Sequence, residues 1–179
     1  MASLPAGSPW RWAFSDLLQS VPTGAGRGRL ASIAAGLGRV AVPWELQTGE
    51  WPEERRYERL IAPDRYEAWL ICWPVGVQLD LHDHGDSSGA FSVVAGQLEE
   101  RVAASGAVRV HAVLAGDTVQ FGRRHVHAIS NLGTRPATSV HVYSPPLRSM
   151  AFYDTDGRGN LVPQRTMSAG ADWAGDRTM

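Results

Sequence analysis

The 179-residue chain has little cysteine, almost no net charge and no long hydrophobic run. Its one cysteine, Cys72, excludes an intrachain disulfide and any cysteine-rich zinc site, which favours a reducing cytoplasm. The formal net charge of −1 provides no basic surface for nucleic acid or for an anionic membrane. No apolar run approaches the roughly 20 residues of a spanning helix, and the N-terminus lacks the pattern of a signal peptide. We therefore expect a cytoplasmic protein.

The composition is that of one ordinary globular domain, with 44% hydrophobic and 20% charged residues. No linker or internal repeat divides the chain, so we expect a single domain over residues 1–179. Residues 1–50 are expected to be helical or irregular, with one short helix after Ser15–Asp16 and another in GRLASIAAGLG that ends at Gly36 or Gly38. Residues 51–155 are expected to hold the β-structure, and 156–179 a tail that frays or wraps the surface.

Short segments rich in β-branched and aromatic residues follow one another from about residue 66, punctuated by Gly, Asn or Pro. No helix-length segment separates them, which predicts an all-β barrel or sandwich and argues against a parallel βαβ sheet. The segments are YEAWLICW (66–73), AFSVVAG (90–96), QLEERVAA (97–104), AVRVHAVL (107–114), DTVQFG (117–122), VHAISNLG (126–133) and ATSVHVYS (137–144).

The stretch GVQLDLHDHGDSSGAFSVVAG (76–96) places two of the six histidines one residue apart in a strand pattern. Alternation along a strand directs His82 and His84 to the same face, where two imidazoles gain little unless something binds both. A solvated edge strand with chance histidines explains this pair alone equally well. A second such pair follows in GDTVQFGRRHVHAISNLG (116–133), with His125 and His127.

The spacing of Gly76, His82, His84, Gly89 and Gly96, and that of Gly116, His127 and Asn131, resembles the two motifs of the cupin superfamily. The resemblance implies a small jelly-roll-like β-barrel in which His82, His84 and His127 hold a metal. Cupins usually have glutamate at the position of Gly89, so this site is expected to consist of three neutral histidines. Such a site leaves about three positions open on an octahedral iron. Zinc with three histidines and a water is the alternative.

HDHGDSSGAF (82–91) followed by SVHVYSPP (139–146), with RYERLI (56–61) upstream, resembles the type I cysteine dioxygenases. These are iron(II) thiol dioxygenases with a cupin barrel, and the bacterial branch is the most similar. The resemblance, over roughly residues 50–155, implies Fe(II) held by His82, His84 and His127, with His125 near the barrel mouth. Mammalian members have a cysteine at the position of Gly89 that cross-links to the active-site tyrosine, so Tyr143 is expected to be unmodified here.

Ser139, His141 and Tyr143 alternate along one strand and are expected to form a hydrogen-bond chain that directs the phenol at the metal. Two hydroxyl-bearing core residues and a core histidine without a shared function would show the same pattern. The resemblance implies that Tyr143 acts on bound dioxygen or substrate with support from His141 and Ser139. A hydrolase triad is rejected because no carboxylate orients the histidine.

The resemblance also implies that Arg59, with Tyr57, binds the substrate carboxylate, because a guanidinium fork matches a carboxylate. Relatives that oxidise 3-mercaptopropionate have glutamine there. The other interpretation is a surface arginine in the charged run EERRYER.

The expected function is therefore iron-dependent conversion of L-cysteine and dioxygen to cysteine sulfinic acid by a monomer with no nucleic-acid or membrane partner. Two alternatives stay open. One is a dioxygenase of another small thiol, such as 3-mercaptopropionate, and the other is a non-catalytic metal-binding cupin.

Overall fold

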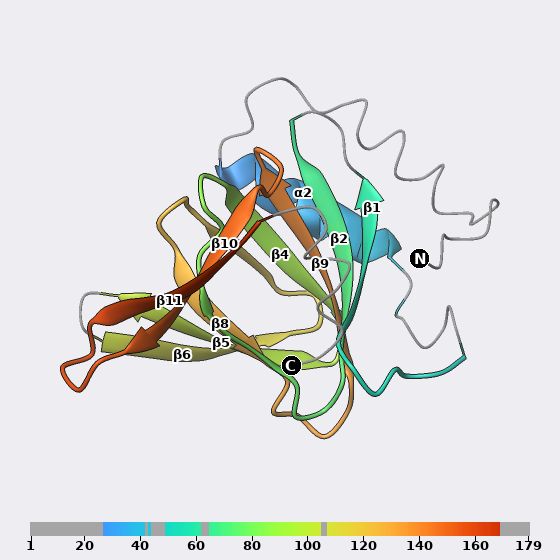
Figure 1. The fold of residues 1–179 in the computed structure, drawn as a ribbon. Coiled ribbons are helices and arrows are strands. Elements are labelled where there is room, and N and C mark those ends of the chain that lie inside the picture. The colour runs from blue at the N-terminus through green and yellow to red at the C-terminus, as the bar shows by residue number, and fades with distance from the viewer. Residues whose placement is uncertain (1–26, 42, 44–48, 62–64, 105–106, 169–179) are drawn as a thin grey trace.

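The computed structural model describes residues 27–41, 43, 49–61, 65–104 and 107–168 (Figure 1). It contains helix α2 (Arg27–Val40) and strands β1 to β11 in chain order. The strands are β1 (Arg56–Ile61), β2 (Glu67–Trp73), β3 (Gln78–His82), β4 (Ser88–Ala95), β5 (Gln97–Ala104), β6 (Ala107–Leu114), β7 (Thr118–Phe121), β8 (Val126–Ser130), β9 (Ala137–Ser144), β10 (Ser149–Thr155) and β11 (Leu161–Ser168).

The described strands form two antiparallel sheets and no closed barrel. One sheet has the order β1-β2-β9-β4-β7, and the other has the order β11-β10-β3-β8-β5-β6. This arrangement confirms the predicted all-β, cupin-type architecture, and each of the seven segments predicted as strands contains a strand. Within the described residues, no helix has the length and apolarity needed to cross a membrane.

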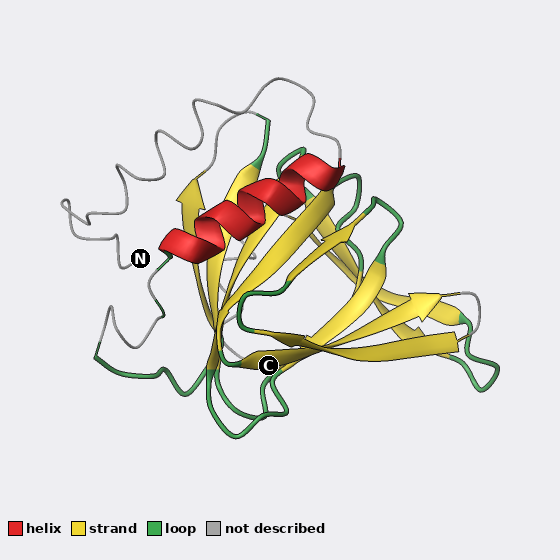
Figure 2. Ribbon diagram, turned by 180° about the vertical axis from the view of Figure 1, so that it is seen from behind, coloured by secondary structure: helices red, strands yellow, loops and turns green. Residues whose placement is uncertain are grey.

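The expectations for residues 1–50 are confirmed only for one helix. Helix α2 confirms the helix expected over residues 28–38, but it continues to Val40 instead of ending at a glycine. The helix expected after Ser15–Asp16 lies outside the described residues. Leu30, Ile33 and Leu37 of α2 are buried against the outer face of the five-stranded sheet (Figure 2). This apolar contact fixes the position of the helix on the sheet.

The C-terminal tail differs from the expectation. Residues 161–168 form β11, which pairs with β10 along its length, so the sheet extends beyond residue 155. The polar composition of this segment hid the strand, because β11 is an edge strand with one exposed face and mostly exposed side chains.

Side chains along β2 and β9 alternate between two faces of the five-stranded sheet. One face packs against α2 and is called the helix side, and the other faces the interior between the two sheets. Val140 and Val142 pack with α2, whereas Ser139, His141 and Tyr143 point between the two sheets. On β2, buried Cys72 lies on the helix side, in agreement with the interpretation of a small buried residue. The interior between the sheets therefore receives the chemistry-bearing side chains of β9.

Candidate metal centre

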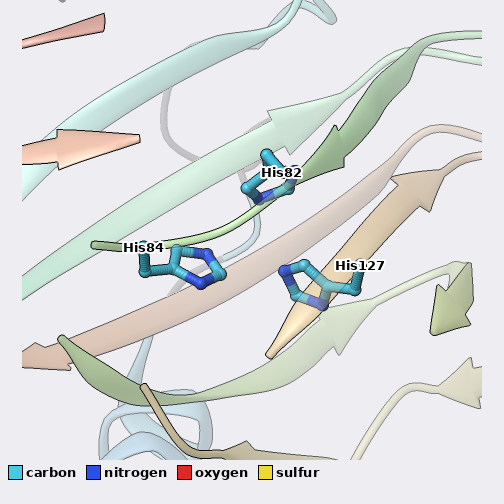
Figure 3. A group of neighbouring side chains, drawn as sticks. All are labelled: His82, His84 and His127. Atoms are coloured by element: carbon cyan, nitrogen blue, oxygen red, sulfur yellow. The ribbon is translucent and has the colours of Figure 1, made fainter. Parts of the chain in front are cut away.

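Three buried histidines converge between the sheets, as Figure 3 shows. His82 at the end of β3 is directly opposite His127 of β8 in the antiparallel register, and their ring centroids are 4.7 Å apart. His84 lies just beyond β3, with its ring centroid 4.9 Å from that of His82 and 5.0 Å from that of His127. One nitrogen from each ring lies within 4.8 Å of the others, so the three can hold one metal ion.

Asp83, between the two histidines, explains why both face inward after the strand ends. Its carboxylate accepts hydrogen bonds from the backbone N–H of Gly85 at 3.0 Å and of Ala151 at 3.1 Å, and from the hydroxyl of Tyr153 at 2.7 Å. These bonds attach Asp83 to β10 and to the following turn. Because successive side chains point in opposite directions, this attachment turns His82 and His84 toward the interior.

The hydrogen bonds of the imidazoles suit metal binding. His82 Nδ1 donates to the backbone carbonyl of Asp80 at 2.7 Å, and His127 Nδ1 donates to Glu100 Oε1 at 2.5 Å. A donating Nδ1 leaves Nε2 with a free lone pair, which is the usual arrangement in metal-bound histidine. Burial lowers the pKa of His82, His84 and His127, which keeps all three neutral. The donor set therefore fits a divalent transition metal such as iron or zinc.

Glu100 on β5 is a site residue that the sequence reasoning missed. Its carboxylate is fully buried and Oε1 accepts hydrogen bonds from His127 and, at 3.0 Å, from His125 Nε2. Oε2 lies 2.8 Å from Nε2 of His111. Burial alone would raise the pKa of Glu100, but the hydrogen bonds from His125 and His127 outweigh it and lower that pKa to about 2. Of the three neutral imidazoles, that of His127 thus has a negative charge directly behind it.

A signal for Glu100 was present in the sequence. In QLEERVAA, the alternation that faces Leu98 inward faces Glu100 inward as well, so a carboxylate occupies a core position. A buried carboxylate needs a partner, and the histidines of β8 are the nearest candidates in a cupin motif. His125, which was expected near the barrel mouth, and His111 are both partners of this carboxylate.

Replacing Glu100 with glutamine is expected to weaken metal binding by roughly 10- to 100-fold, because the amide loses the charge that orients and polarises His127. Competition with a chelator on the purified protein measures this affinity. Glu99→Gln is the matched control, since Glu99 is the neighbouring acid on the opposite face of β5. Equal affinities in the Glu100→Gln variant and in the control would show that the carboxylate does not support the metal.

Ser139, His141 and Tyr143 are joined as the alternation suggested. Trp73 Nε1 donates to Ser139 Oγ at 2.8 Å, and Ser139 Oγ lies 2.9 Å from His141 Nε2. His141 Nδ1 lies 3.2 Å from the Tyr143 hydroxyl. The Tyr143 ring is 5.1 Å from that of His84, which places the phenol beside the histidine triad. All four side chains of this hydrogen-bond chain, from Trp73 to Tyr143, are buried.

Burial sets the protonation of the two titratable members. Burial, assisted by the positive charge of Arg55, lowers the pKa of His141 to about 3, so this imidazole is neutral near pH 7. Burial and the nearby Glu67 raise the pKa of Tyr143 above its ordinary value, so the phenol keeps its proton. The chain therefore ends in a neutral O–H group beside the site.

The buried histidines make stability depend on pH. Their folded-state pKa values lie below 6.5, so between those values and 6.5 the unfolded chain binds more protons than the folded chain. Stability is therefore retained above pH 6.5 and lost as the pH falls below it. For His82, His84 and His141 together, we expect the free energy of unfolding of the metal-free protein to drop by roughly 4 kcal/mol between pH 7.5 and 5.5.

Denaturant titrations between pH 7.5 and 5.5 measure how the free energy of unfolding changes with pH. His141→Asn is expected to remove about a third of that change. A free energy of unfolding that stays constant down to pH 5.5 would contradict the burial of neutral imidazoles.

Gly89, where the resemblance places a cysteine or a glutamate in relatives, is opposite Tyr143 on β9 and Phe121 on β7. A Cβ at Gly89 would lie 2.4 Å from Phe121 Cζ and 2.9 Å from the carbonyl oxygen of Val142. The Phe121 ring, which stacks on His84 at 4.7 Å, thus fills the space of the missing side chain. Glycine is required there by this close approach.

A cavity of about 60 Å³ opens at the triad, with room for roughly four to six water-sized groups. His82, His127, His141 and Tyr143 form its polar wall. The other lining residues are Arg55, Tyr57, Trp69, Ile71, Trp73, Leu79, Ile129, Met150, Phe152 and Met167. A small ligand, rather than a peptide, fits this space.

The two residues predicted to bind a carboxylate, Tyr57 and Arg59, have different positions relative to the cavity. Tyr57 lines the cavity, whereas Arg59 is exposed and is not among the lining residues. The Arg59 guanidinium carbon lies 5.7 Å from the ring centroid of Trp69. The arginine that lines the cavity is Arg55, in the same charged run EERRYER.

Comparison with known proteins agrees with these observations. The profile of the family "Cysteine dioxygenase type I" matches residues 32–156. Cysteine dioxygenase type 1 of Danio rerio is 30% identical over 125 residues, covering 62% of this chain and 62% of that protein. The Homo sapiens protein of that name is 25% identical over 138 residues, covering 66% and 69%.

A solved structure with a double-stranded β-helix domain, from Klebsiella pneumoniae, is 19% identical with a TM-score of 0.51, covering 57% of this chain and 82% of that one. That likeness concerns the fold alone. The match to the family profile spans most of helix α2, strands β1 to β10 and all three histidines of the triad. The chain therefore belongs to the type I cysteine dioxygenase family.

Proposed function

We propose that the protein is an iron(II)-dependent thiol dioxygenase that converts L-cysteine and dioxygen to cysteine sulfinic acid. The observation that carries this proposal is the meeting of two groups in one small cavity, the histidine triad and the phenol of Tyr143. In the overall reaction, both atoms of dioxygen join the thiol sulfur and the thiol proton is retained on the sulfinic acid. Family membership supports the reaction class.

Iron(II), when bound by His82, His84 and His127, supplies the redox chemistry that transfers oxygen to sulfur. The apolar walls of the cavity exclude water and keep the reacting groups close together. The Glu100 carboxylate holds the tautomer of His127, so that Nε2 faces the site.

Tyr143 is the group that we assign to oxygen stabilisation. When Ser139 donates to Nε2 of His141, Nδ1 of His141 donates to the Tyr143 oxygen, and the phenolic O–H is left to donate into the cavity. A pre-oriented neutral donor stabilises charge as it develops on oxygen, with no rearrangement during the reaction.

A second candidate is a dioxygenase of a thiol that carries no ammonium group, such as 3-mercaptopropionate. This candidate is favoured by the cavity wall, because the lining residues within the described part of the chain include no Asp or Glu that could pair with an ammonium group. The cavity would then recognise the carboxylate and the thiol alone.

Oxygen uptake by the iron(II)-loaded protein tests both candidates, with L-cysteine, 3-mercaptopropionate and cysteamine given in parallel. Uptake with L-cysteine and formation of its sulfinic acid is the expected result. Faster uptake with 3-mercaptopropionate would select the second candidate. Iron binding without uptake for any thiol would leave a non-catalytic metal-binding cupin.

A further inference from the structure

The three imidazoles of the triad are not held in the same way. Nδ1 of His82 donates a hydrogen bond to the backbone carbonyl of Asp80. Nδ1 of His127 donates one to Glu100. Nδ1 of His84 is buried and has no hydrogen-bond partner among the described residues. A metal-bound histidine usually donates its second ring N–H, because that bond fixes the tautomer and the orientation of the ring. The ring of His84 therefore needs another contact to orient it.

The backbone of His84 is fixed, but its bonds do not set the direction of the ring. Asp83 attaches this segment to the following turn and to β10. The backbone carbonyl of His84 accepts a hydrogen bond from the N–H of Ser87 at 3.0 Å. These bonds place the Cβ atom of His84. The two side-chain torsions that direct the ring nitrogens depend on what the imidazole packs against.

An aromatic side chain packs face to face with the imidazole of His84. The ring of Phe121 is nearly parallel to it, with an interplanar angle of 25° and 4.7 Å between the centroids. The rings of His82 and His127 are nearly perpendicular to it, at 76° and 73°. The Tyr143 ring makes a more tilted contact, at 33° and 5.1 Å. Of these four rings, that of Phe121 is both the closest to His84 and the most nearly parallel.

Phe121 is itself held in place from two directions. It is buried on β7 and lies opposite Gly89 of β4, where the lack of a side chain makes room for the ring. It also stacks on His125, at 15° and 5.1 Å between the centroids. His125 is hydrogen-bonded to Glu100 at 3.0 Å. Because close packing leaves the Phe121 ring little freedom, it can limit the rotation of His84.

We infer that Phe121 is a positioning residue that orients the metal ligand His84 through ring stacking. The stacking takes the place of the hydrogen bond that the other two imidazoles have. This inference rests on the proposed function, because it concerns the same metal site. Without the Phe121 ring, the imidazole of His84 is free to rotate away from the metal, and binding has to restrict that rotation.

The test compares Phe121→Leu and Phe121→Met, which remove the ring but keep an apolar side chain, with Phe91→Leu. Phe91 is the matched control, because it is also buried and stacks on an imidazole outside the triad, that of His141, at 12° and 5.0 Å. The Phe91 ring lies farther from His127, at 6.3 Å, and that histidine keeps its hydrogen bond to Glu100. Chelator competition gives Kd for zinc(II) and iron(II), and denaturant titration gives the stability of the metal-free protein.

Nitrogen NMR of the zinc-loaded, isotopically labelled protein observes each imidazole separately. In the unmodified protein, His82, His84 and His127 should each show one set of ring resonances. In Phe121→Leu, the resonances of His84 should broaden or split, whereas those of His82 and His127 should not. The reason is that the ring of His84 then exchanges between orientations, while the hydrogen bonds of the other two are retained.

We expect both Phe121 variants to raise Kd for zinc(II) and iron(II) by about 3- to 10-fold, the range that one aromatic ring contact contributes to an equilibrium constant. Phe91→Leu should destabilise the metal-free protein to a similar extent, because it also removes a buried ring. Its Kd for either metal should stay within about twofold of the unmodified protein.

An equal rise in Kd for Phe91→Leu and Phe121→Leu would overturn the inference, since a general loss of packing would then explain both. Unchanged Kd and unchanged His84 resonances in both Phe121 variants would overturn it as well. If the unmodified protein oxidises no thiol, the proposed function fails. A change confined to His84 in the zinc-loaded Phe121→Leu variant would still support Phe121 as the residue that positions this ligand.

Discussion

Replacing His84 with alanine is expected to abolish stoichiometric iron(II) binding and to lower thiol-dependent oxygen uptake by more than about 100-fold. Loss of an outer hydrogen-bond partner alone reduces metal affinity or activity by about 10- to 100-fold, so loss of a direct ligand should exceed that range. His84 is buried, with its ring about equally far from those of His82 and His127. Metal content after iron loading, measured together with oxygen uptake, tests this prediction.

His125→Ala is the matched comparison. His84→Ala removes one histidine of the pair His82 and His84, and His125→Ala removes one histidine of the pair His125 and His127. His125 is hydrogen-bonded to Glu100, and Glu100, His125 and His127 form a second group that could hold a metal. Iron at the proposed triad should survive His125→Ala with affinity within about tenfold of the unmodified protein. Loss of iron in His125→Ala and its retention in His84→Ala would move the metal to the second group.

Tyr143→Phe is expected to lower kcat for thiol oxidation by roughly 10²- to 10³-fold, the range found when one pre-oriented hydrogen-bond donor is removed from a reacting oxygen. Iron content should stay unchanged, because the three candidate ligands His82, His84 and His127 are retained. The ring and its packing are retained in phenylalanine, so the loss isolates the hydroxyl. Steady-state oxygen uptake and metal analysis on one preparation measure both quantities.

Ser139→Ala tests whether the chain behind the phenol contributes. It removes the group next to His141 Nε2 but leaves the Tyr143 hydroxyl in place, so we expect a smaller loss, about tenfold in kcat. Tyr66→Phe is the control, since Tyr66 is a buried tyrosine packed on the helix side of the five-stranded sheet. Turnover of Tyr143→Phe equal to that of Tyr66→Phe would exclude a role for the hydroxyl.

Alternation along strands made much of the site predictable. It placed His82 with His84 and Ser139 with His141 and Tyr143, because the direction of successive side chains depends only on the local backbone. Short β-branched segments separated by turn residues likewise predicted the strands. The strand β11 escaped this reasoning, since an edge strand exposed to solvent needs no apolar pattern.

Neighbours distant in sequence determined the rest. The register of β3 on β8 places His127 opposite His82, and the packing of β7 on β4 lets Phe121 exclude any side chain at Gly89. The sequence by itself determined the fold class and the residues that share a strand face, and its resemblance to a known family named His82, His84 and His127 as one site. Only the tertiary structure decided that Glu100 accepts a hydrogen bond from His127 and that Arg55, not Arg59, lines the cavity. The physical reason is that local geometry sets a side chain's direction, whereas its partners depend on which strands pack together.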